Sequence, residues 1–201
     1  GPERFDLSSM FLVTSSAAVF FPTVKDRFLE VMPNLMIIDA IGSSEGGHNG
    51  LVMVGKGGTA MKGGGPTVAA GRDAVVLDDD LKPVAPGSGI IGRIGRSGNI
   101  PLGYHKDAVK TAATFVEVDG ERYCFTGDMA TVEADGTIQL LGRGSQCINT
   151  GGEKVFPEEV ESQIVDHPKV TDVLVVGIPD ERWGNAVTAV VAPADPSEPP
   201  S

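Results

Sequence analysis

The stretch "LGRGSQCINTGGEKVFPEEVE", residues 141–161, places a glycine pair and a lysine before a predicted helix, as a phosphate-binding loop does. Such a loop binds its anion through free N–H groups and the positive dipole end of the helix. Here Pro157 suits the first helical position, and the two glutamates after it fill the first turn with negative charge. A phosphate would be repelled there. Gly151 and Gly152 are therefore predicted to serve a bend, or the close approach of a thin, uncharged group.

A second motif is predicted to bring a carboxylate and a guanidinium together. Asp135-Gly136 has the sequence of a favoured two-residue hairpin turn. With these residues as the loop, Asp128 faces Arg143 with Cβ atoms about 5 Å apart, and Ala134 faces Thr137. An exposed ion pair there contributes at most about 1 kcal/mol. The other interpretation is that both groups bind one polar ligand, which the glycines in "TGD" and "LGR" favour because backbone without Cβ lets a ligand come close.

The overall composition excludes several classes of partner. The 201 residues are 41% hydrophobic, enough for one domain or for one domain and part of another. The net charge of −11, with no cluster of lysines and arginines, argues against nucleic acid. The longest apolar runs, such as "VLVVGI" at 173–178, are far shorter than the roughly 20 residues that span a bilayer, so no transmembrane segment is predicted.

The cysteines and histidines do not form a predicted site. Cys124 and Cys147 are too few for a disulfide framework or a four-ligand metal site, which favours a reducing, cytoplasmic location. His48, His105 and His167 are scattered without ligand spacing. We expect all three to be ordinary surface or loop residues.

The first 50 residues read as an α/β unit. A buried strand is predicted at 10–14, a helix from Pro22 to Met32 and a second buried strand at 35–39, because apolar runs and Pro33 delimit them. One face of the helix is apolar: Val24, Phe28 and Val31. Ligands of such units bind outside the carboxyl ends of the strands, so the loops 15–20 and 41–50 are expected at one rim.

Two further regions with different predicted secondary structure follow residue 50. Short strands and glycine-rich turns fill 51–143, including a second Asp-Gly hairpin turn at Asp119-Gly120, and predict a mostly antiparallel sheet or barrel without a long helix. After it come a helix at about 157–166 and two strands, "DVLVVGI" and "AVTAVVA". The predicted domains are an α/β part (1–50), a β-barrel-like subdomain (51–143) and a partial small α+β domain (144–201).

Six stretches in a fixed order resemble the adenylate-forming enzyme superfamily and, within it, the acyl-CoA synthetases. They are "SSAAVF", "IGSSEGG", "IGRIGRSGNIPLGYHKD", "YCFTGD", "LGRGSQCINTGGEKVFPEEVE" and "VVGIPDERWGNAVTAVV". The match that they define runs from residue 15 to residue 191 and so extends over nearly the whole chain. The amino-acid sequences of "GSSEGG" and "GRGSQCINTGGEKVFPEEVE" are most similar to those of synthetases for long-chain fatty or steroid side-chain acids. The resemblance implies a truncated ANL-type architecture, in which a carboxylic acid attacks the α-phosphate of ATP and CoA then displaces AMP. It implies ATP, Mg²⁺ and CoA as cofactor and co-substrates, and is compatible with an oligomer.

The resemblance also implies roles for individual residues. Ser44 matches a hydroxyl that touches the α-phosphate, Glu45 a carboxylate that helps to hold Mg²⁺, and Asp128 the acceptor of the ribose hydroxyls, with Arg143 beside it. Gly151 and Gly152 match the loop that lines the pantetheine tunnel. Ser145 matches the hinge of the small domain, although the family usually has Asp or Lys there. The adenine-binding walls match the following residues: Ala17, Ala18, Asp39, Ala40, Ile41, Gly42 and Ser43.

Departures from the family pattern limit these expectations. Ile41 stands where an aromatic residue commonly stacks on adenine. The family's phosphate loop and its adenylation lysine are expected outside residues 1–201, so this chain alone is predicted not to adenylate. Two other functions stay open: an aryl-acid or amino-acid adenylating domain that delivers to a carrier protein, and a non-catalytic AMP-binding module.

Overall fold

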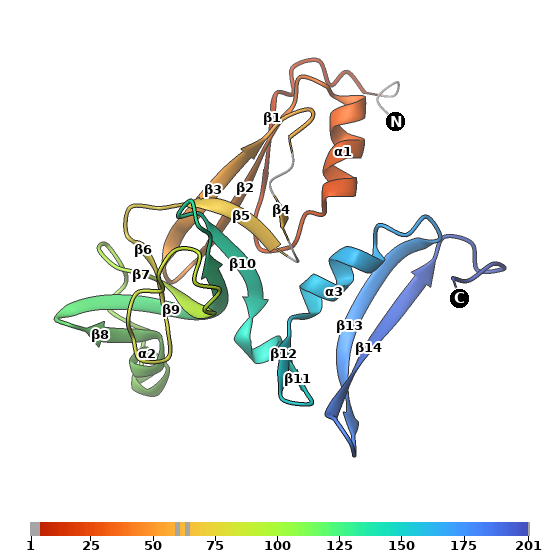
Figure 1. Cartoon of the computed structure of the whole chain (residues 1–201). Coiled ribbons are helices and arrows are strands. Elements are labelled where there is room, and N and C mark those ends of the chain that lie inside the picture. Colours follow the sequence, from red (N-terminus) through yellow and green to blue (C-terminus); the bar gives the residue numbers. More distant parts are fainter. Residues whose placement is uncertain (1–4, 59–60, 63–64, 201) are drawn as a thin grey trace. The chain divides into compact units, whose positions relative to one another are not determined.

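In the computed structural model, which describes residues 5–58, 61–62 and 65–200, the chain begins with a parallel strand pair joined by a helix (Figure 1). Strand β1 (Leu12–Ser15) leads to helix α1 (Pro22–Val31) and strand β2 (Met36–Ser43). The two strands pair from Leu12 opposite Met36 to Ser15 opposite Asp39. The predicted strand, helix and strand are confirmed, and the helix ends where expected, just before Pro33.

The burial predicted for this region is partly wrong. In the predicted strand 10–14, Met10, Phe11 and Leu12 are 41%, 72% and 41% exposed. The apolar helix face is exposed as well, while the helix buries its other side through Lys25 and Leu29. β1 lies at one end of the strand order in the described residues, so it has a neighbouring strand on one side only. By contrast, the predicted buried strand at 35–39 is confirmed, because Leu35, Ile37 and Asp39 are all buried.

The predicted loop 41–50 is instead a hairpin. β2 continues to Ser43 and returns as antiparallel strand β3 (Gly47–Val54), with Ser43 opposite Gly47. Gly42 permits this pairing, because a Cβ there would lie 2.3 Å from the carbonyl oxygen of Gly47. The turn is therefore only residues 44–46.

These strands belong to one ten-stranded sheet, in the order β1-β2-β3-β5-β10-β9-β7-β6, with β4 beside β5 and β8 beside β9. The further strands are β4 (Met61–Lys62), β5 (Gly65–Ala70), β6 (Ala74–Leu77), β7 (Gly92–Arg96), β8 (Phe115–Val118), β9 (Glu121–Val132) and β10 (Ile138–Arg143). β1 and β2 pair in parallel, whereas β2–β3, β3–β5, β5–β10, β7–β9, β6–β7 and β8–β9 are antiparallel pairs, as predicted. In the part of the chain that the structure describes, the strand order does not close into a barrel. Side chains of the sheet strands themselves form a core cluster that includes Ile41, Val68, Ile94 and Ile138.

One short helix in this region was not predicted. Helix α2 (Ala108–Thr114) begins after Asp107, whose side chain accepts a hydrogen bond from the backbone N–H of Lys110. Asp is a favoured helix N-cap, so the start signal is present in the sequence. The predicted strand around "ATFVEV" therefore begins only at Phe115.

The two Asp-Gly turns have different geometries. At the first, Val118 pairs with Glu121, and Asp119 and Gly120 have φ of 52° and 83°, which confirms the two-residue turn. At the second, the N–H of Glu133 donates to the carbonyl of Thr137 at 2.8 Å. The N–H of Gly136 (φ 83°) donates to the carbonyl of Glu133 at 2.9 Å, so the loop has three residues, 134–136.

This second turn corrects the hairpin prediction. Because Glu133 rather than Ala134 pairs with Thr137, the predicted register is wrong at the turn. The side chain of Asp135 stabilises the longer loop by accepting hydrogen bonds from the backbone N–H and the hydroxyl of Thr137. The predicted pairing of Asp128 with Arg143 therefore no longer follows from the turn.

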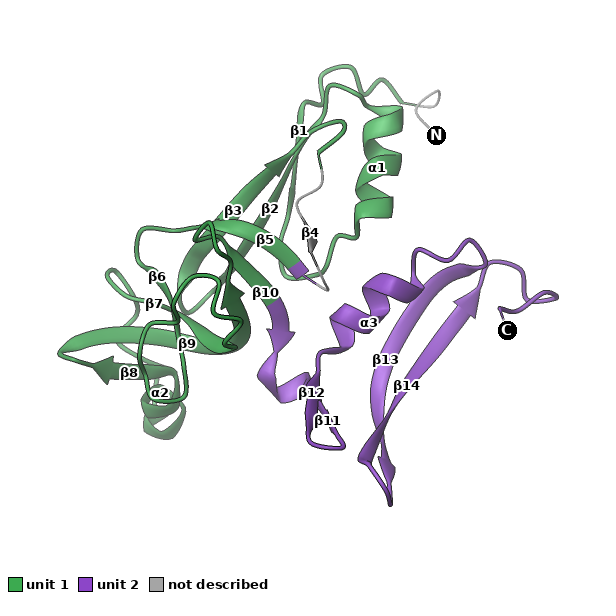
Figure 2. Cartoon of the chain, in the orientation of Figure 1, with its two compact units in different colours: residues 1–62, 66–140 green, residues 63–65, 141–201 purple. Residues whose placement is uncertain are grey.

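Two compact units divide the chain, residues 1–62 with 66–140 (unit 1) and residues 63–65 with 141–201 (unit 2), coloured separately in Figure 2. Unit 2 contains a 3₁₀ turn η2 (Gly144–Gln146), strands β11 (Ile148–Thr150) and β12 (Glu153–Val155), helix α3 (Pro157–Ile164), and strands β13 (Val170–Asp180) and β14 (Gly184–Pro193). The predicted helix and the two strands after it are confirmed. Pro157 opens α3, with Glu158 and Glu159 in its first turn. The domain boundaries predicted at 50 and 143 stay predictions.

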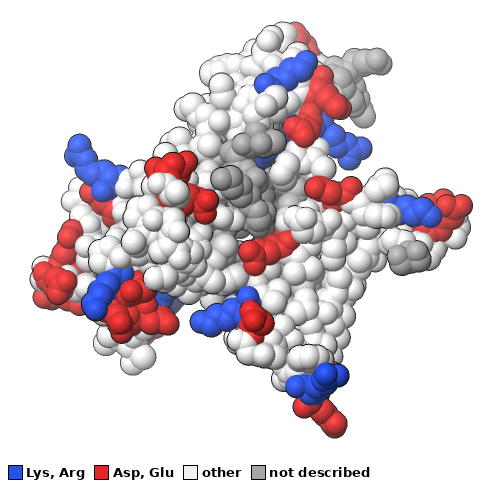
Figure 3. Space-filling view, in the orientation of Figure 1, with Lys and Arg blue, Asp and Glu red and all other residues white. Residues whose placement is uncertain are grey.

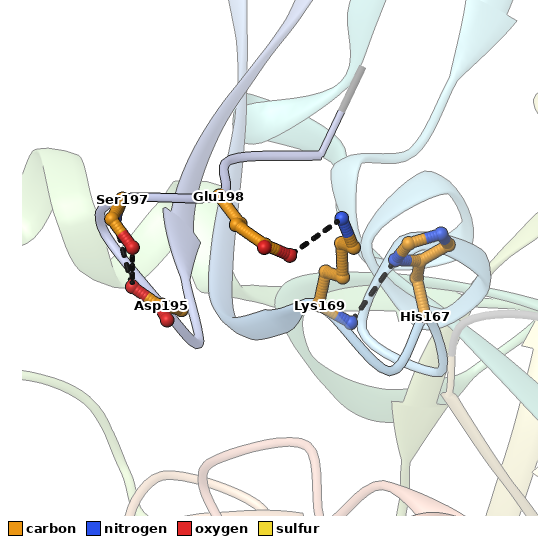
Figure 4. Close-up of polar contacts among 5 residues, drawn as sticks. All are labelled: His167, Lys169, Asp195, Ser197 and Glu198. Atoms are coloured by element: carbon orange, nitrogen blue, oxygen red, sulfur yellow. Dashed lines mark hydrogen bonds and ion pairs between the residues drawn. The ribbon is translucent and has the colours of Figure 1, made fainter.

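Charged side chains at the end of unit 2 form an exposed network (Figure 4). The ammonium of Lys169 lies 3.5 Å from the carboxylate of Glu198, and the backbone N–H of Lys169 donates to Nδ1 of His167 at 3.2 Å. His167 is exposed, as are His48 and His105, which confirms the surface positions predicted for the histidines. On the face shown in Figure 3, lysines and arginines are scattered among acidic patches, in line with the net charge of −11.

Candidate functional site

The turn between β2 and β3 presents a hydroxyl and a carboxylate. The side-chain oxygen of Ser43 accepts a hydrogen bond from the N–H of Gly46 at 2.8 Å and so closes the turn. Gly46 is buried, and a Cβ on it would lie 3.2 Å from that oxygen and 3.6 Å from Sγ of Cys124. Ser44 is exposed at the tip and Glu45 is half-buried. The sequence therefore places Ser44 and Glu45 on a tight and well-packed hairpin.

The carboxylate of Glu45 is held by a tyrosine far away in the sequence. The hydroxyl of Tyr104 donates to Oε1 of Glu45 at 2.7 Å. The negative charge of Glu45 also acts on Cys124, whose pKa is raised to about 11, first by burial and then by this charge. Cys124 is therefore a neutral thiol under the turn.

Arg96 supports the other side of the turn. Its Nη1 donates to the carbonyl of His48 at 2.6 Å, and its Nη2 lies 3.7 Å from Oδ2 of Asp73. A Cβ on Gly47 (φ 73°) would lie 3.0 Å from Nη1 of Arg96. The guanidinium thus packs tightly against the first residues of β3.

The loop after β1 begins beside the middle of β2. Ser15, the last residue of β1, pairs with Asp39, so Ala17 and Ala18 follow where β2 continues from Ala40 to Ser43. Both alanines are exposed, and Ala17 has φ of 68°, an uncommon conformation for a residue with a Cβ. Strained backbone of this kind clusters at ligand sites. The residues predicted as adenine-binding walls thus start from two paired strands.

Two of the residues predicted to form the adenine-binding walls, Asp39 and Ile41, have buried side chains. Asp39, 5% exposed, forms an ion pair with Lys25 of α1, itself 3% exposed. The ammonium of Lys25 also lies 5.7 Å from the ring centroid of Phe20. Ile41 is 7% exposed within the core cluster. Neither side chain is therefore exposed to a ligand in this structure.

Asp128 lies on an irregular part of β9. Across β7, Arg93 pairs with Met129 and Gly95 with Phe125, so three residues, "TGD", lie opposite one. The φ of Gly127 is 93°, and the hydroxyl of Thr126 donates to Oδ2 of Asp128 at 2.8 Å. Such bulges redirect a side chain and are common next to active sites. The glycine noted in the sequence thus serves the bulge.

Arg143 and Ser145 belong to unit 2. Arg143 is the exposed last residue of β10, and Ser145 is exposed in the 3₁₀ turn that follows. Asp128 belongs to unit 1. The site residues predicted from the sequence are therefore divided between the two units.

The glycine pair of unit 2 forms the predicted bend. Gly151 and Gly152 have φ of 57° and 92°, values that favour glycine. The N–H of Gly151 donates to the carbonyl of Trp183 at 2.9 Å, and a Cβ on Gly151 would lie 2.8 Å from Cε3 of that indole ring. The group that approaches Gly151 closely in this structure is therefore Trp183. Apart from Gly152 and its two chain neighbours, no described residue has an atom within 4 Å of a Cβ built on Gly152.

A carboxylate on α3 packs against the end of β10. A Cβ on Gly142 (φ 143°) would lie 2.5 Å from Oε2 of Glu158. That oxygen has no hydrogen-bond partner among the described residues. Burial, as the largest cause, raises the pKa of Glu158 above its ordinary value of 4.5.

Comparisons with known proteins identify this arrangement. Residues 159–200 match the family model described as the AMP-binding enzyme C-terminal domain. The chain is 57% identical over 193 residues to a 3-oxocholest-4-en-26-oate–CoA ligase of Rhodococcus rhodochrous, with 96% of the chain and 34% of the relative covered. This chain is similar to part of the adenylate-forming enzymes. A medium/long-chain-fatty-acid–CoA/3-oxocholest-4-en-26-oate–CoA ligase of Mycobacterium marinum is 53% identical, over 97% of the chain and 35% of the relative.

Solved structures of adenylate-forming enzymes share the fold. An anthranilate CoA ligase, AuaEII, in complex with anthranoyl-AMP has a TM-score of 0.77 and 27% identity, over 98% of this chain and 37% of that one. The chain spans about a third of the length of the curated relatives it matches. It therefore contains part of an adenylate-forming architecture, as predicted. Within the described ranges, no helix has both the length and the apolar character needed to cross a membrane.

Sequence reasoning missed the residues that support the turn. Lys25, Arg96 and Tyr104 contact residues 14, 48 and 59 positions away. Tyr104 lies in the stretch "GYHKD" that contributed to the resemblance, but nothing local assigns its partner. The sequence gives no signal for Lys25, because it does not show which side of α1 is buried.

Proposed function

We propose that the full-length protein is an AMP-forming acyl-CoA ligase. The observation that carries the proposal is the 57% identity to a CoA ligase, which extends over 96% of the chain and so includes the turn, the bulge and the glycine loop. The names of the relatives support medium-chain to long-chain fatty acids or steroid side-chain acids as substrates.

The proposed reaction has two steps. A carboxylate oxygen of the acid attacks the α-phosphorus of ATP, and the bond to pyrophosphate breaks, which gives an acyl-adenylate. The thiolate of CoA then attacks the acyl carbonyl, and AMP leaves. The protein mainly orients the reactants and stabilises developing charge.

Unit 1 is proposed to serve the first step. Ser44, exposed at the tip of the turn, donates its hydroxyl to the α-phosphate. Asp128 on the β9 bulge accepts hydrogen bonds from the ribose hydroxyls. The adenine lies against the loop of Ala17 and Ala18 and against the backbone from Asp39 to Ser43.

The residues of the turn fit a magnesium ion bound together with a nucleotide. Mg²⁺ prefers oxygen ligands and is usually held by one or two carboxylates, with phosphates and water completing the shell. Glu45 supplies one such carboxylate. Within 5–58, 61–62 and 65–200, no group of three or more His, Cys, Asp or Glu residues is placed to hold a metal on its own. When bound, the ion would neutralise phosphoryl charge.

Unit 2 is proposed to serve the second step. The bend at Gly151 and Gly152 lines the path of the thin pantetheine arm of CoA, and Ser145 is the hinge about which the small domain turns. Neither role needs charge at the loop, which agrees with the acidic start of α3. Because the chain spans about a third of its relatives, we also propose that the 201 residues alone do not adenylate.

The test is acid-dependent exchange of pyrophosphate into ATP by the full-length protein, across fatty, steroid side-chain and aryl acids, followed by addition of CoA. We expect exchange with fatty or steroid acids, loss of exchange in Asp128→Ala, and thioester on adding free CoA. Transfer only to a carrier protein would contradict the ligase. AMP binding without exchange would instead support a non-catalytic module.

A further inference from the structure

The loop before α2 places a tyrosine hydroxyl on the carboxylate of the turn. Tyr104 Oη lies 2.7 Å from Oε1 of Glu45, and both side chains are half-buried. Tyr104 lies 59 positions after Glu45, and the residues between them include β3 to β7, so the contact depends on the folded sheet. A hydrogen bond to an ionised carboxylate is stronger than one between neutral groups.

Tyr104 is itself fixed from several sides. Its N–H donates to the hydroxyl oxygen of Thr111 at 2.9 Å, and the hydroxyl of Thr111 donates to the carbonyl of Asp107 at 2.6 Å. The ammonium of Lys110 lies 4.0 Å from the ring centroid, and the ring of Phe115 is 5.9 Å away. The α2 segment therefore anchors both the backbone and the ring, and the hydroxyl has a defined position.

We propose that Tyr104 is a positioning residue that orients Glu45 toward the Mg²⁺ of the bound nucleotide. The inference rests on the proposed function. A hydroxyl bound to one carboxylate oxygen restricts rotation of the group and directs the other oxygen, so less conformational entropy is lost when the ion binds. Tyr104 makes no bond with the substrates in this role.

The other tyrosine of the chain provides a matched control. Tyr123 also donates its hydroxyl to a glutamate, Glu121, at 3.1 Å, and its ring packs against Phe125. That pair lies on the exposed β8–β9 hairpin, where no ligand is proposed. Replacing each tyrosine by phenylalanine removes the same kind of bond at two places.

The experiment measures Mn²⁺ binding to the full-length protein by electron paramagnetic resonance, with α,β-methylene-ATP present. Because loss of a partner that orients a metal ligand commonly weakens metal binding about tenfold or more, Tyr104→Phe should raise the Kd for Mn²⁺ by about that factor. Tyr123→Phe should leave the Kd within about twofold, since an exposed hydrogen bond contributes little. The Mg²⁺ concentration that half-saturates pyrophosphate exchange should rise in parallel in Tyr104→Phe.

A double-mutant cycle separates orientation from general stability. In Glu45→Gln, addition of Tyr104→Phe should weaken Mn²⁺ binding much less than it does in the wild type, because any general destabilisation cancels in the cycle. An unchanged Kd in Tyr104→Phe, equal losses in both backgrounds, or a Tyr104→Phe protein that does not fold would overturn the inference. A wild type that binds no metal–nucleotide complex and performs no exchange would contradict the proposed function instead.

Discussion

The turn of unit 1 and the glycine loop of unit 2 both depend on glycine, but they are held in different ways. Residues 44–46 are fixed by side chains from distant strands and loops, including Tyr104 and Arg96. The loop around Gly151 is fixed by its own backbone angles and by the neighbouring β13–β14 hairpin, through Trp183. The first arrangement fixes the positions of charged and polar side chains, whereas the second fixes the course of the backbone. This contrast is compatible with the proposed charge stabilisation in one step and the proposed passage of a neutral arm in the other.

The largest expected effect is a loss of stability when the buried ion pair between α1 and β2 is broken. Lys25→Met leaves Asp39 charged and buried without its partner, and removal of one member of a buried pair costs about 3–5 kcal/mol. Hydrogen exchange of β2 amides in the full-length protein measures this loss. Lys169→Met, which removes the exposed pair with Glu198 in unit 2, should cost less than about 1 kcal/mol. Equal costs would show that burial does not distinguish the two pairs.

The second prediction concerns the charge at the turn. Glu45→Gln keeps an oxygen near Tyr104 but removes the negative charge proposed to hold Mg²⁺. Because preorganised charge at a phosphoryl group is a large catalytic term, pyrophosphate exchange should fall about a hundredfold. Thioester formation from a supplied acyl-adenylate should change far less. An equal fall in both half-reactions would remove the proposed division of labour.

A third prediction concerns the shape of the glycine loop. Gly151→Ala places a Cβ 2.8 Å from Trp183 at φ of 57°, so thioester formation should fall about tenfold through local strain, with exchange nearly unchanged. Gly152→Ala has a similar backbone penalty without a contact within 4 Å in the described residues, and should have a smaller effect. Rapid-quench assays of the CoA step compare the two variants. A larger effect for Gly152→Ala would argue against the Trp183 contact.

The smallest effect concerns the pH dependence of unit 2. The pKa of Glu158 is raised in the folded protein, so the folded state binds this proton more tightly than the unfolded chain. The free energy of unfolding should therefore fall as pH rises from the ordinary value near 4.5 through the raised one, and stay lower at neutral pH. Glu158→Gln should stabilise α3 at pH 7 and remove this decline, as measured by hydrogen exchange corrected for intrinsic rates. Stabilisation of the wild type with rising pH would contradict the sign.

Local patterns predicted the parts of the fold that local interactions determine. The strand, helix and strand at the start, the turn at Asp119-Gly120 and the start of α3 at Pro157 follow from apolar runs, turn residues and caps. The three-residue turn at 134–136 did not, because Asp135-Gly136 is compatible with both turn types and Asp135 favours the longer one through Thr137.

The features that the sequence did not predict depend on contacts between residues far apart in the chain. The pairing of β2 with β3 converted a predicted loop into a hairpin, and the contacts of Lys25 and Tyr104 have no local signature. The exposure of the apolar α1 face likewise depends on what surrounds it rather than on its period. The roles of Ser44, Arg143 and Ser145 stay predictions. Those of Asp128 and the glycine loop stay predictions that the variants above test.

The most direct test of this account measures the two half-reactions separately in Glu45→Gln and Gly151→Ala. Exchange of pyrophosphate into ATP reports the first step, and thioester formation from isolated acyl-adenylate and CoA reports the second. We predict that Glu45→Gln loses exchange and retains thioester formation, while Gly151→Ala does the reverse. Loss of the same half-reaction in both variants, or no loss in either, would contradict the account.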